Sequence, residues 1–221
     1  MKPIRKRVQS RSEGLASKLP ETEAFMFDPI ELQREFFEGL TTIDAAIVER
    51  AAKEPCRDCG GPLYRGDYPR KPRGGWLASA AEAFGRSFSL CCGRDGCRHR
   101  VTPPSVRFLG RRVYVGAVVI FVSAVALAVV TASAVARTTG VPARTTRRWL
   151  RWWRGPFTTS APFVDLFARL VPAPDRRRLP TSLLERLDGD DRTRLSRFLA
   201  WLAPITTTSC PDGSRWVRGV M

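Results

Sequence analysis

Five closely grouped cysteines constrain this chain more than any other feature of its sequence. Cys56 and Cys59 form the run CRDCGG, and Cys91, Cys92 and Cys97 follow in the run LCCGRDGC. Two cysteines separated by two residues and followed by glycine let the backbone turn so that both sulfurs reach one metal ion. A second cysteine pair at this separation completes a four-sulfur tetrahedron. The spacing therefore predicts a zinc ribbon, a small β unit folded around one ion.

Either Cys91 or Cys92 can supply the third thiolate. If a strand precedes them, Phe88, Leu90 and Cys92 share one face, and this face points Cys92 inward. Four thiolates leave no open coordination position for a substrate water, so this zinc would hold the fold together rather than do chemistry. The expected ligands are Cys56, Cys59, Cys92 and Cys97, with Cys91 as the alternative to Cys92.

Two other interpretations of these cysteines compete with the zinc site: buried free thiols and a redox-active pair. No strand-helix-strand pattern surrounds Cys56 and Cys59, which disfavours redox chemistry. Residues 1–20 are basic and polar, without the apolar stretch of a secretory signal. We therefore expect a reducing compartment, in which paired cysteines bind metal more often than they form disulfides.

Positive charge is concentrated in one part of the chain. The 221 residues carry a formal net charge of +16, and most of the 37 basic residues are arginine. A GC-rich coding bias accounts for part of the arginine content, but not for its distribution. Residues 94–154 hold twelve arginines and a single acid, Asp95. This concentration indicates a polyanionic partner, either nucleic acid or an anionic membrane surface.

Residues 132–151 fit the pattern of a helix-turn-helix. The small Ala136 falls late in a first helix, where two helices cross closely. Gly140 supplies a tight turn, Val141 enters the core, and Pro142 suits the first position of a second helix. Thr139 departs from the pattern, because an apolar residue is usual at its position.

The second helix, expected over residues 141–154, is apolar on one side and basic on the other. Thr146, Trp149 and Leu150 are expected to face inward. The spacing of Trp149 and Trp153 is that of a core stripe, which favours packing over base stacking. The basic side chains would point outward to the major groove of duplex DNA, unless this is an ordinary surface helix with solvated arginines. They are Arg144, Arg147, Arg148 and Arg151.

A turn-rich loop and a basic strand are expected to contact phosphates. The loop lies between the two cysteine groups, and the strand follows the second group. The residues are Arg70, Lys71 and Arg73 in the loop, and Arg98, Arg100, Arg107, Arg111 and Arg112 in and after the strand.

Residues 113–136 contain no charge and are long enough for a transmembrane helix. Both flanks are basic, so no inside–outside bias emerges. Spanning would also separate the cysteine groups from the basic helix. A buried first helix of a three-helix domain accounts for the same apolarity. A single-pass membrane protein with a cytosolic zinc ribbon is therefore kept as an alternative.

The expected fold is mainly α with a small β zinc ribbon, followed by a helix-turn-helix domain. Helices are also expected over 28–39, where Asp28 is a candidate N-cap, and from Thr41 or Thr42 to residue 51. The acids Asp188, Asp190 and Asp191 suit the N-terminus of a helix over 191–203. Shorter helices are expected over 76–86, 163–171 and 181–188. The expected divisions are a basic flexible arm (1–22), a helical preface (23–55), the zinc ribbon with its basic loop (56–112), the helix-turn-helix (113–155), a C-terminal helical segment (156–205) and a tail (206–221).

The order of these motifs resembles the N-terminal DNA-binding half of insertion-sequence transposases. The resemblance covers residues 55–154 and rests on CxxCGG, CCx4C and the run GVPARTTRRWL. It implies that Cys56, Cys59, Cys92 and Cys97 bind zinc. It also implies that Arg144, Arg147 and Arg148 form the outward face of a recognition helix. Segments such as TPPSVRFLGRRVY also resemble uncharacterised bacterial proteins often found with mobile elements.

One departure from that family bears on function. Such transposases continue into a ribonuclease-H-like domain with three separated carboxylates, and the residues after Arg154 are too few for it. No Ser/His or Cys/His nucleophile pair and no phosphate-binding glycine loop is found, and His99 is the only histidine. We therefore expect a non-enzyme that binds duplex DNA in the cytoplasm, at the nucleoid, with a transposase or a second copy as possible partner. An RNA-binding or protein-interaction ribbon is the remaining alternative.

Overall fold

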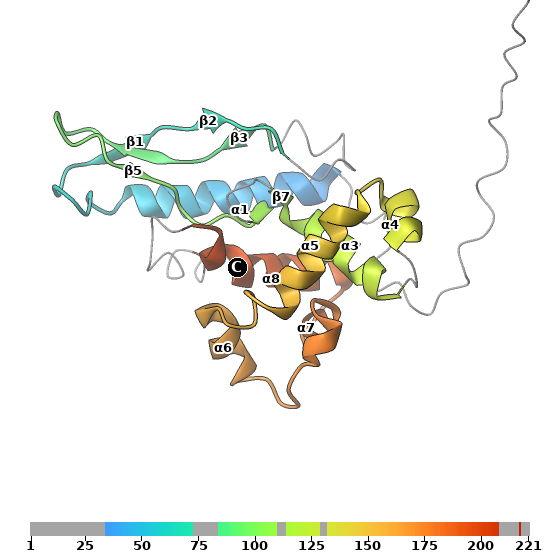
Figure 1. The fold of residues 1–221 in the computed structure, drawn as a ribbon. Coiled ribbons are helices and arrows are strands. Elements are labelled where there is room, and N and C mark those ends of the chain that lie inside the picture. The colour runs from blue at the N-terminus through green and yellow to red at the C-terminus, as the bar shows by residue number, and fades with distance from the viewer. Residues whose placement is uncertain (1–33, 73–83, 110–113, 129–131, 208–216, 218–221) are drawn as a thin grey trace, which may run out of the picture.

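The computed structural model describes residues 34–72, 84–109, 114–128 and 132–207, together with Val217. Figure 1 shows the strands of a ribbon above a long helix, α1 (Arg34–Ala52), with the other helices below α1 and to one side. About half of the described residues are helical, and the strands are short and antiparallel. The expected class, mainly helical with a small β unit, is confirmed at this level.

Helix α1 is continuous, so the expected break before residue 41 is wrong. The sequence predicts that Thr41 or Thr42 begins a second helix. The hydroxyls of Thr41 and Thr42 instead donate hydrogen bonds to the carbonyl oxygens of Phe37 (3.0 Å) and Glu38 (3.1 Å). This bond to the preceding turn is the alternative open to a mid-helix threonine. The expected N-cap Asp28 lies outside the described residues.

The apolar face of α1 holds the helix against the rest of the molecule. Its buried residues recur at helical spacing, which marks one face of an amphipathic helix. One polar residue, Asp44, lies on this buried face. The buried apolar residues are Phe36, Phe37, Leu40, Ile47, Val48 and Ala51.

The ribbon is a three-stranded antiparallel sheet in the order β1-β4-β5. The strands are β1 (Leu63–Arg65), β4 (Leu90–Cys92) and β5 (Arg100–Val101). Leu63 pairs with Cys92 and Leu90 with Val101. Leu90 and Cys92 are buried and Cys91 between them is half-buried, so the expected alternation is confirmed.

Two further strand pairs extend the ribbon and join it to the helices. Strand β2 (Tyr68–Pro69) pairs with β3 (Arg86–Ser87). Strand β6 (Phe108–Leu109) pairs with β7 (Tyr114–Val115), which leads directly into the next helix. The helix expected over 76–86 falls mostly outside the described residues.

Three helices follow and contact one another: α3 (Gly116–Ala128), α4 (Ala132–Thr139) and α5 (Ala143–Arg154). The uncharged run 113–136 is therefore divided among β7, α3 and part of α4. Helix α3 contacts α4, α5, α8, β6 and β7, so apolar residues are buried around its whole circumference. Within the described part of the chain, no helix has the length and apolarity needed to cross a membrane.

The C-terminal helices complete the hydrophobic core, and one of them, α8, packs against α3. They are α6 (Ala161–Phe167), a 3-10 turn η2 (Arg176–Arg178), α7 (Thr181–Leu184), α8 (Asp191–Leu202) and a second 3-10 turn η3 (Ala203–Thr206). Asp190 caps α8 by accepting a hydrogen bond from the Thr193 N–H at 2.7 Å. Asp190 and Asp191 thus lie at a helix N-terminus, as expected.

An aromatic cluster joins the C-terminal helices to α5. The ring of Trp153 stacks on Phe198 of α8, with centroids 5.9 Å apart, and contacts Phe157 at 4.7 Å. The Trp153 Nε1–H donates to the hydroxyl of Ser123 in α3 at 2.9 Å. The expectation that Trp149 and Trp153 pack in the core is confirmed, because both side chains are buried.

Candidate metal centre and basic helix

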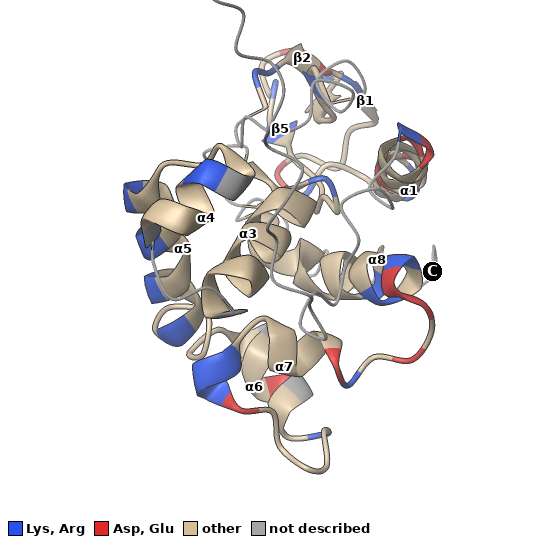
Figure 2. Ribbon diagram, turned by 90° about the vertical axis from the view of Figure 1, so that its right-hand side faces the viewer, with Lys and Arg blue, Asp and Glu red and all other residues tan. Residues whose placement is uncertain are grey.

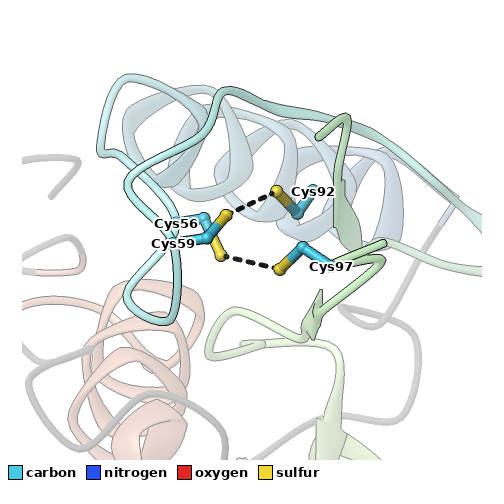
Figure 3. Close-up of side chains that lie close together, drawn as sticks. All are labelled: Cys56, Cys59, Cys92 and Cys97. Atoms are coloured by element: carbon cyan, nitrogen blue, oxygen red, sulfur yellow. Dashed lines mark hydrogen bonds between the residues drawn. The ribbon is translucent and has the colours of Figure 1, made fainter. Parts of the chain in front are cut away.

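Four cysteines from two knuckles meet at one end of the ribbon (Figure 3). Cys56 and Cys59 lie in the turn after α1, which is closed by backbone hydrogen bonds between Cys56 and Gly61 (2.8 Å) and between Gly60 and Cys56 (2.7 Å). Cys92 ends β4, and Cys97 follows in the second turn. Figure 3 shows the sulfurs of the two pairs facing one another.

The four sulfurs have the spacing of a metal tetrahedron. All lie within 4.8 Å of one another, with Cys59 and Cys92 Sγ 3.4 Å apart and Cys56 and Cys97 Sγ 3.8 Å apart. A zinc–sulfur bond of about 2.3 Å gives a tetrahedral edge of about 3.8 Å. The four cysteines can therefore hold one metal ion with little movement.

Cys91 does not belong to this group. Its side chain is half-buried, and its Sγ lies near the carbonyl oxygens of Cys92 (3.8 Å) and Arg98 (3.6 Å). Of the two candidates left open by the sequence, only Cys92 shares a site with Cys56, Cys59 and Cys97. The alternation of side chains along β4 is the reason, because it directs adjacent cysteines to opposite faces.

Backbone N–H groups point at two of the sulfurs. Gly61 donates to Cys59 Sγ and Arg94 to Cys92 Sγ, each at 3.4 Å, so the two knuckles repeat one arrangement. The Gly61 hydrogen bond lowers the pKa of the Cys59 thiol to about 7. The His99 N–H acts in the same direction on Cys97. The neighbouring thiols, led by Cys59, together with burial nevertheless raise the pKa of Cys97 to about 12.

The pKa of Cys59 is thus lowered and that of Cys97 is raised within one group of sulfurs that lie close together. Four neighbouring thiols cannot all carry a negative charge unless a cation lies between them. A divalent cation at their centre would reverse that balance and hold all four as thiolates. Thiolate ligands select soft or borderline ions such as zinc. A site closed by four of them has no coordination position open to a substrate.

Gly61, the second glycine after the first cysteine pair, leaves room for the two knuckles to approach each other. A Cβ on Gly61 would lie 3.0 Å from the Arg94 Cβ, 3.1 Å from Cys92 Sγ and 3.3 Å from Cys59 Sγ. These contacts are tighter than those of ordinary side chains, so a larger residue would push the two knuckles apart. The second glycine of CRDCGG thus fits the close approach of the two cysteine pairs.

Two side-chain contacts also tie one knuckle to the other. His99 Nδ1 lies 2.7 Å from Asp58 Oδ2, and the Arg94 guanidinium donates to the Cys59 carbonyl oxygen. Local sequence patterns do not pair His99 with Asp58, because the two residues lie in different turns. In the structure both contacts bridge the turns that carry the sulfurs.

The basic residues expected on the ribbon have different environments. Arg70, Lys71 and Arg98 are exposed. Arg100 is also exposed, but its Nη1 donates within the ribbon to the Gly66 carbonyl (2.7 Å) and to the Ser89 hydroxyl (2.8 Å). Three other basic residues of that set lie outside the described part of the chain: Arg73, Arg111 and Arg112.

Arg107 is buried in the core, so the expectation that it lies at the surface for phosphates is wrong. Only 1% of its surface is exposed, and its Nε lies 2.7 Å from Asp44 Oδ2 on α1. The guanidinium also lies 4.1 Å from the centroid of the Phe88 ring. Asp44 further accepts hydrogen bonds from the Val106 N–H (2.7 Å) and the Ser105 hydroxyl (2.5 Å). A buried carboxylate with three donors needs this cation.

One sequence signal pointed to this ion pair. Asp44 lies on the same helical face as Leu40, Ile47 and Val48, where an acid is out of place unless a buried partner meets it. The sequence cannot identify the partner, because Arg107 is one of many arginines. The structure identifies it as the arginine that leads into β6.

Helix α5 carries a stripe of exposed arginines (Figure 2). All of its exposed side chains are arginines, and its sequence contains no acid. Their spacing places them along one side of the helix. Figure 2 shows these basic positions following one edge of the molecule, with a further one on α4. The exposed residues of α5 are Arg144, Arg147, Arg151 and Arg154.

Two residues of α5 differ from the expected arrangement. Arg148 is half-buried rather than outward, because its guanidinium donates to the Tyr114 hydroxyl and lies 5.3 Å from the centre of that ring. Tyr114 in turn contacts the ring of Trp149 at 5.3 Å. Leu150 is only half-buried. Together with Arg147, Arg151 and Arg154 it lines an open hollow of about 420 Å³.

The turn between α4 and α5 explains the unusual threonine. Gly140 has φ +65°, and Val141 is buried. The buried Thr139 donates its hydroxyl to the Val135 carbonyl (2.8 Å) and accepts from the Val141 N–H (3.3 Å). Thr139 thus satisfies two backbone groups at the helix end that an apolar residue would leave to other partners.

Comparison with protein-family models, with curated proteins and with solved structures finds no significant match for this chain.

Proposed function

We propose that this chain is a zinc-stabilised DNA-binding protein, similar in type to the DNA-binding part of insertion-sequence transposases. Zinc bound by the four cysteines holds the ribbon. Helices α4 and α5 act as a helix-turn-helix, and α5 enters the major groove. The protein works in the cytoplasm, on nucleoid DNA.

The observation that carries this proposal is the composition of the exposed side of α5. Each exposed side chain there is an arginine, and none of the four takes part in an ion pair within the described residues. A solvated surface helix commonly mixes charges of both signs, because opposite charges three or four residues apart stabilise it. A purely cationic stripe is stabilised instead by an anionic partner.

The size of the stripe suits duplex DNA. From Arg144 to Arg154 the helix rises about 15 Å. The major groove is about 12 Å wide and admits one helix. The opposite side of α5 is anchored by Trp149 and Trp153 in the core, so the arginines are presented on a rigid element.

The ribbon contributes affinity in this proposal. Arg70, Lys71 and Arg98 are exposed to phosphates, with Arg70 also donating to the Tyr68 hydroxyl (3.0 Å) and Arg98 lying 3.9 Å from Asp95. Arg100 instead holds the strands together. Phosphate contacts give affinity and register, and base contacts give sequence preference. Arg107 is removed from this set because Asp44 neutralises it in the core.

In this proposal the protein is not an enzyme, because the acids at the start of α8 have structural contacts. Asp190 caps α8, and Asp191 lies 3.5 Å from Arg194. These acids therefore stabilise a helix start rather than form a carboxylate set for two metal ions.

One observation favours the ribbon-based alternative of single-strand RNA binding. Tyr64 on β1 is 61% exposed, and an exposed aromatic ring beside basic residues is a surface for base stacking. Preference for single strands over duplex, lost in Tyr64→Ala, would select this alternative.

The first test is binding of the zinc-loaded chain to duplex DNA across a salt series, measured by fluorescence anisotropy. Each phosphate contact adds about 0.9 to the slope of log affinity against log salt concentration. We expect a steep fall in affinity with salt. Chelation of the metal should abolish binding, and added zinc should restore it. Absence of binding at low salt would refute the proposal.

A further inference from the structure

The side chains that α5 offers to a groove belong to a single chemical type. Residues 132–154, which cover α4 and α5, contain no Asn, Gln, Asp or Glu. Asn and Gln pair with adenine in the major groove, and Asp and Glu accept from cytosine. The exposed stripe of α5 holds only guanidinium groups.

The guanidinium group distinguishes between bases. Guanine presents two acceptors to the major groove, O6 and N7, which match two N–H donors of one arginine fork. Adenine presents one acceptor beside an amino donor, and cytosine presents an amino donor. A second guanidinium donor is left unpaired against either of them, so guanine is the preferred partner.

Three of these arginines form one local group. Arg147, Arg151 and Arg154 line the hollow of about 420 Å³ together with Leu150. No hydrogen bond or ion pair of their guanidinium groups occurs within the described residues, whereas Arg148 between them is bound to Tyr114. The structure thus separates an anchoring arginine from three that are available to a ligand.

We infer that α5 reads guanine, and that the preferred duplex site carries guanine bases opposite Arg147 and its neighbours in the major groove. This inference rests on the proposed function and names the base that gives the site its preference. Arginines that contacted only phosphates would give the same affinity without any base preference.

The experiment is selection of bound sequences from a randomised duplex by the full, zinc-loaded chain. Enrichment of guanine at fixed positions is expected. The selected duplex is then prepared with 7-deazaguanine at those positions, which removes the N7 acceptor and keeps Watson–Crick pairing. Affinity should fall about tenfold. Unchanged affinity for the 7-deaza duplex would overturn the inference.

Two variants distinguish the bidentate geometry of the Arg147 guanidinium from its positive charge. Arg147→Lys keeps the charge but loses the bidentate fork. It should reduce the preference for guanine over adenine at one position about tenfold, with an unchanged salt slope. Arg186→Lys, an exposed arginine on the turn after α7, should leave the preference unchanged. Zinc content and circular dichroism establish that both variants fold.

The outcomes distinguish this inference from the proposed function. Salt-dependent duplex binding with no base preference, or with a preference for A·T pairs, overturns guanine readout and leaves the DNA-binding proposal standing. Absence of binding to any duplex overturns both.

Discussion

Cys91 and Cys92 are neighbours in sequence with different environments. Cys92 lies among the four sulfurs, and Cys91 lies outside them. Cys92→Ser should therefore bind far less zinc than the native chain and lower its melting temperature, because a tetrahedral site loses one of four thiolates. Cys91→Ser should keep one zinc per chain. Metal analysis of the purified variants measures both, and equal loss of zinc in the two would contradict the assignment.

The Asp44–Arg107 pair is a second case in which one residue has a large effect. Asp44→Ala removes the carboxylate that pairs with the buried Arg107 guanidinium, so the free energy of unfolding should fall by about 3–5 kcal/mol. Urea unfolding followed by circular dichroism measures this loss.

The matched control is Glu38→Ala on the same helix. Its ion pair with Arg34 is exposed, so its removal should change stability by no more than about 0.5 kcal/mol. Similar losses in the two variants would show that burial does not set the importance of the Asp44 pair.

The sequence predicted which four cysteines come together, because a metal-binding pattern depends on local spacing and a sequence displays that spacing directly. It failed for Arg107 because the role of an arginine depends on what it meets in space. Arg107 and Arg100 have the same side chain, yet one neutralises a buried acid and the other joins strands. Arg148 was misplaced for the same reason, since Tyr114 lies in a different element.

At the scale of elements, the turn between α4 and α5 predicts that the same substitution, glycine to alanine, has opposite effects on stability at two sites. Gly140 has φ +65°, and a Cβ there would meet nothing within 4 Å. Gly140→Ala should therefore destabilise the protein by about 1 kcal/mol, through backbone strain alone. Gly39 also has open space around it, but lies inside helix α1. Gly39→Ala should stabilise by about 0.5–1 kcal/mol.

Thermal or urea unfolding of the two glycine variants tests this contrast. The substitution is the same at both sites, and neither adds a contact. Equal effects of one sign would mean that the left-handed turn is not held in solution.

The start of α8 gives a pH-dependent prediction. Hydrogen bonds from the Thr193 hydroxyl and N–H hold the pKa of Asp190 below its usual value. A carboxyl whose folded pKa is depressed stabilises the fold above its unfolded pKa, and this contribution is lost as pH falls through the folded pKa. Asp190→Ala should therefore melt below the native protein at pH 7, and the gap should narrow below about pH 4.

Differential scanning calorimetry between pH 7 and pH 3 follows this gap. Asp188→Ala is the control, because no hydrogen bond of its carboxylate occurs within the described residues. A gap for Asp190→Ala that stayed constant over this range would contradict a role for the ionised cap.

Elements with strong local signals were predicted well. Helices α5 and α8 lie close to the expected ranges, because amphipathic spacing and a capping acid are local features. Helix α1 was wrongly divided, because threonine has both a capping and a mid-helix hydrogen bond open to it. The uncharged run after residue 113 could not be divided from sequence, because a buried helix and a membrane helix have the same composition.

For the whole molecule, the metal site and the helices share one hydrophobic core. Leu63, Leu90 and Cys92 of the ribbon belong to the same buried cluster as Val118 of α3 and Trp153 of α5. Loss of zinc should therefore loosen more than the ribbon. A chelator titration should shift tryptophan emission to longer wavelength as Trp149 and Trp153 become exposed, together with a loss of helical circular dichroism.

Tryptophan emission and circular dichroism should change over the same range of chelator. Readdition of zinc should restore both signals, and Cys91→Ser should behave as the native chain. Loss of zinc without any change in tryptophan emission would show that the helices fold independently of the ribbon.

The central position of α3 has a consequence for synthesis on the ribosome. Helix α3 is covered by α8, which emerges roughly sixty residues later. At about 5–20 residues per second, the face of α3 that packs on α8 waits about 3–12 s for its partner. Transiently exposed apolar surface of this kind is prone to aggregation. The late synthesis of α8 therefore sets how long this face of a new molecule stays uncovered.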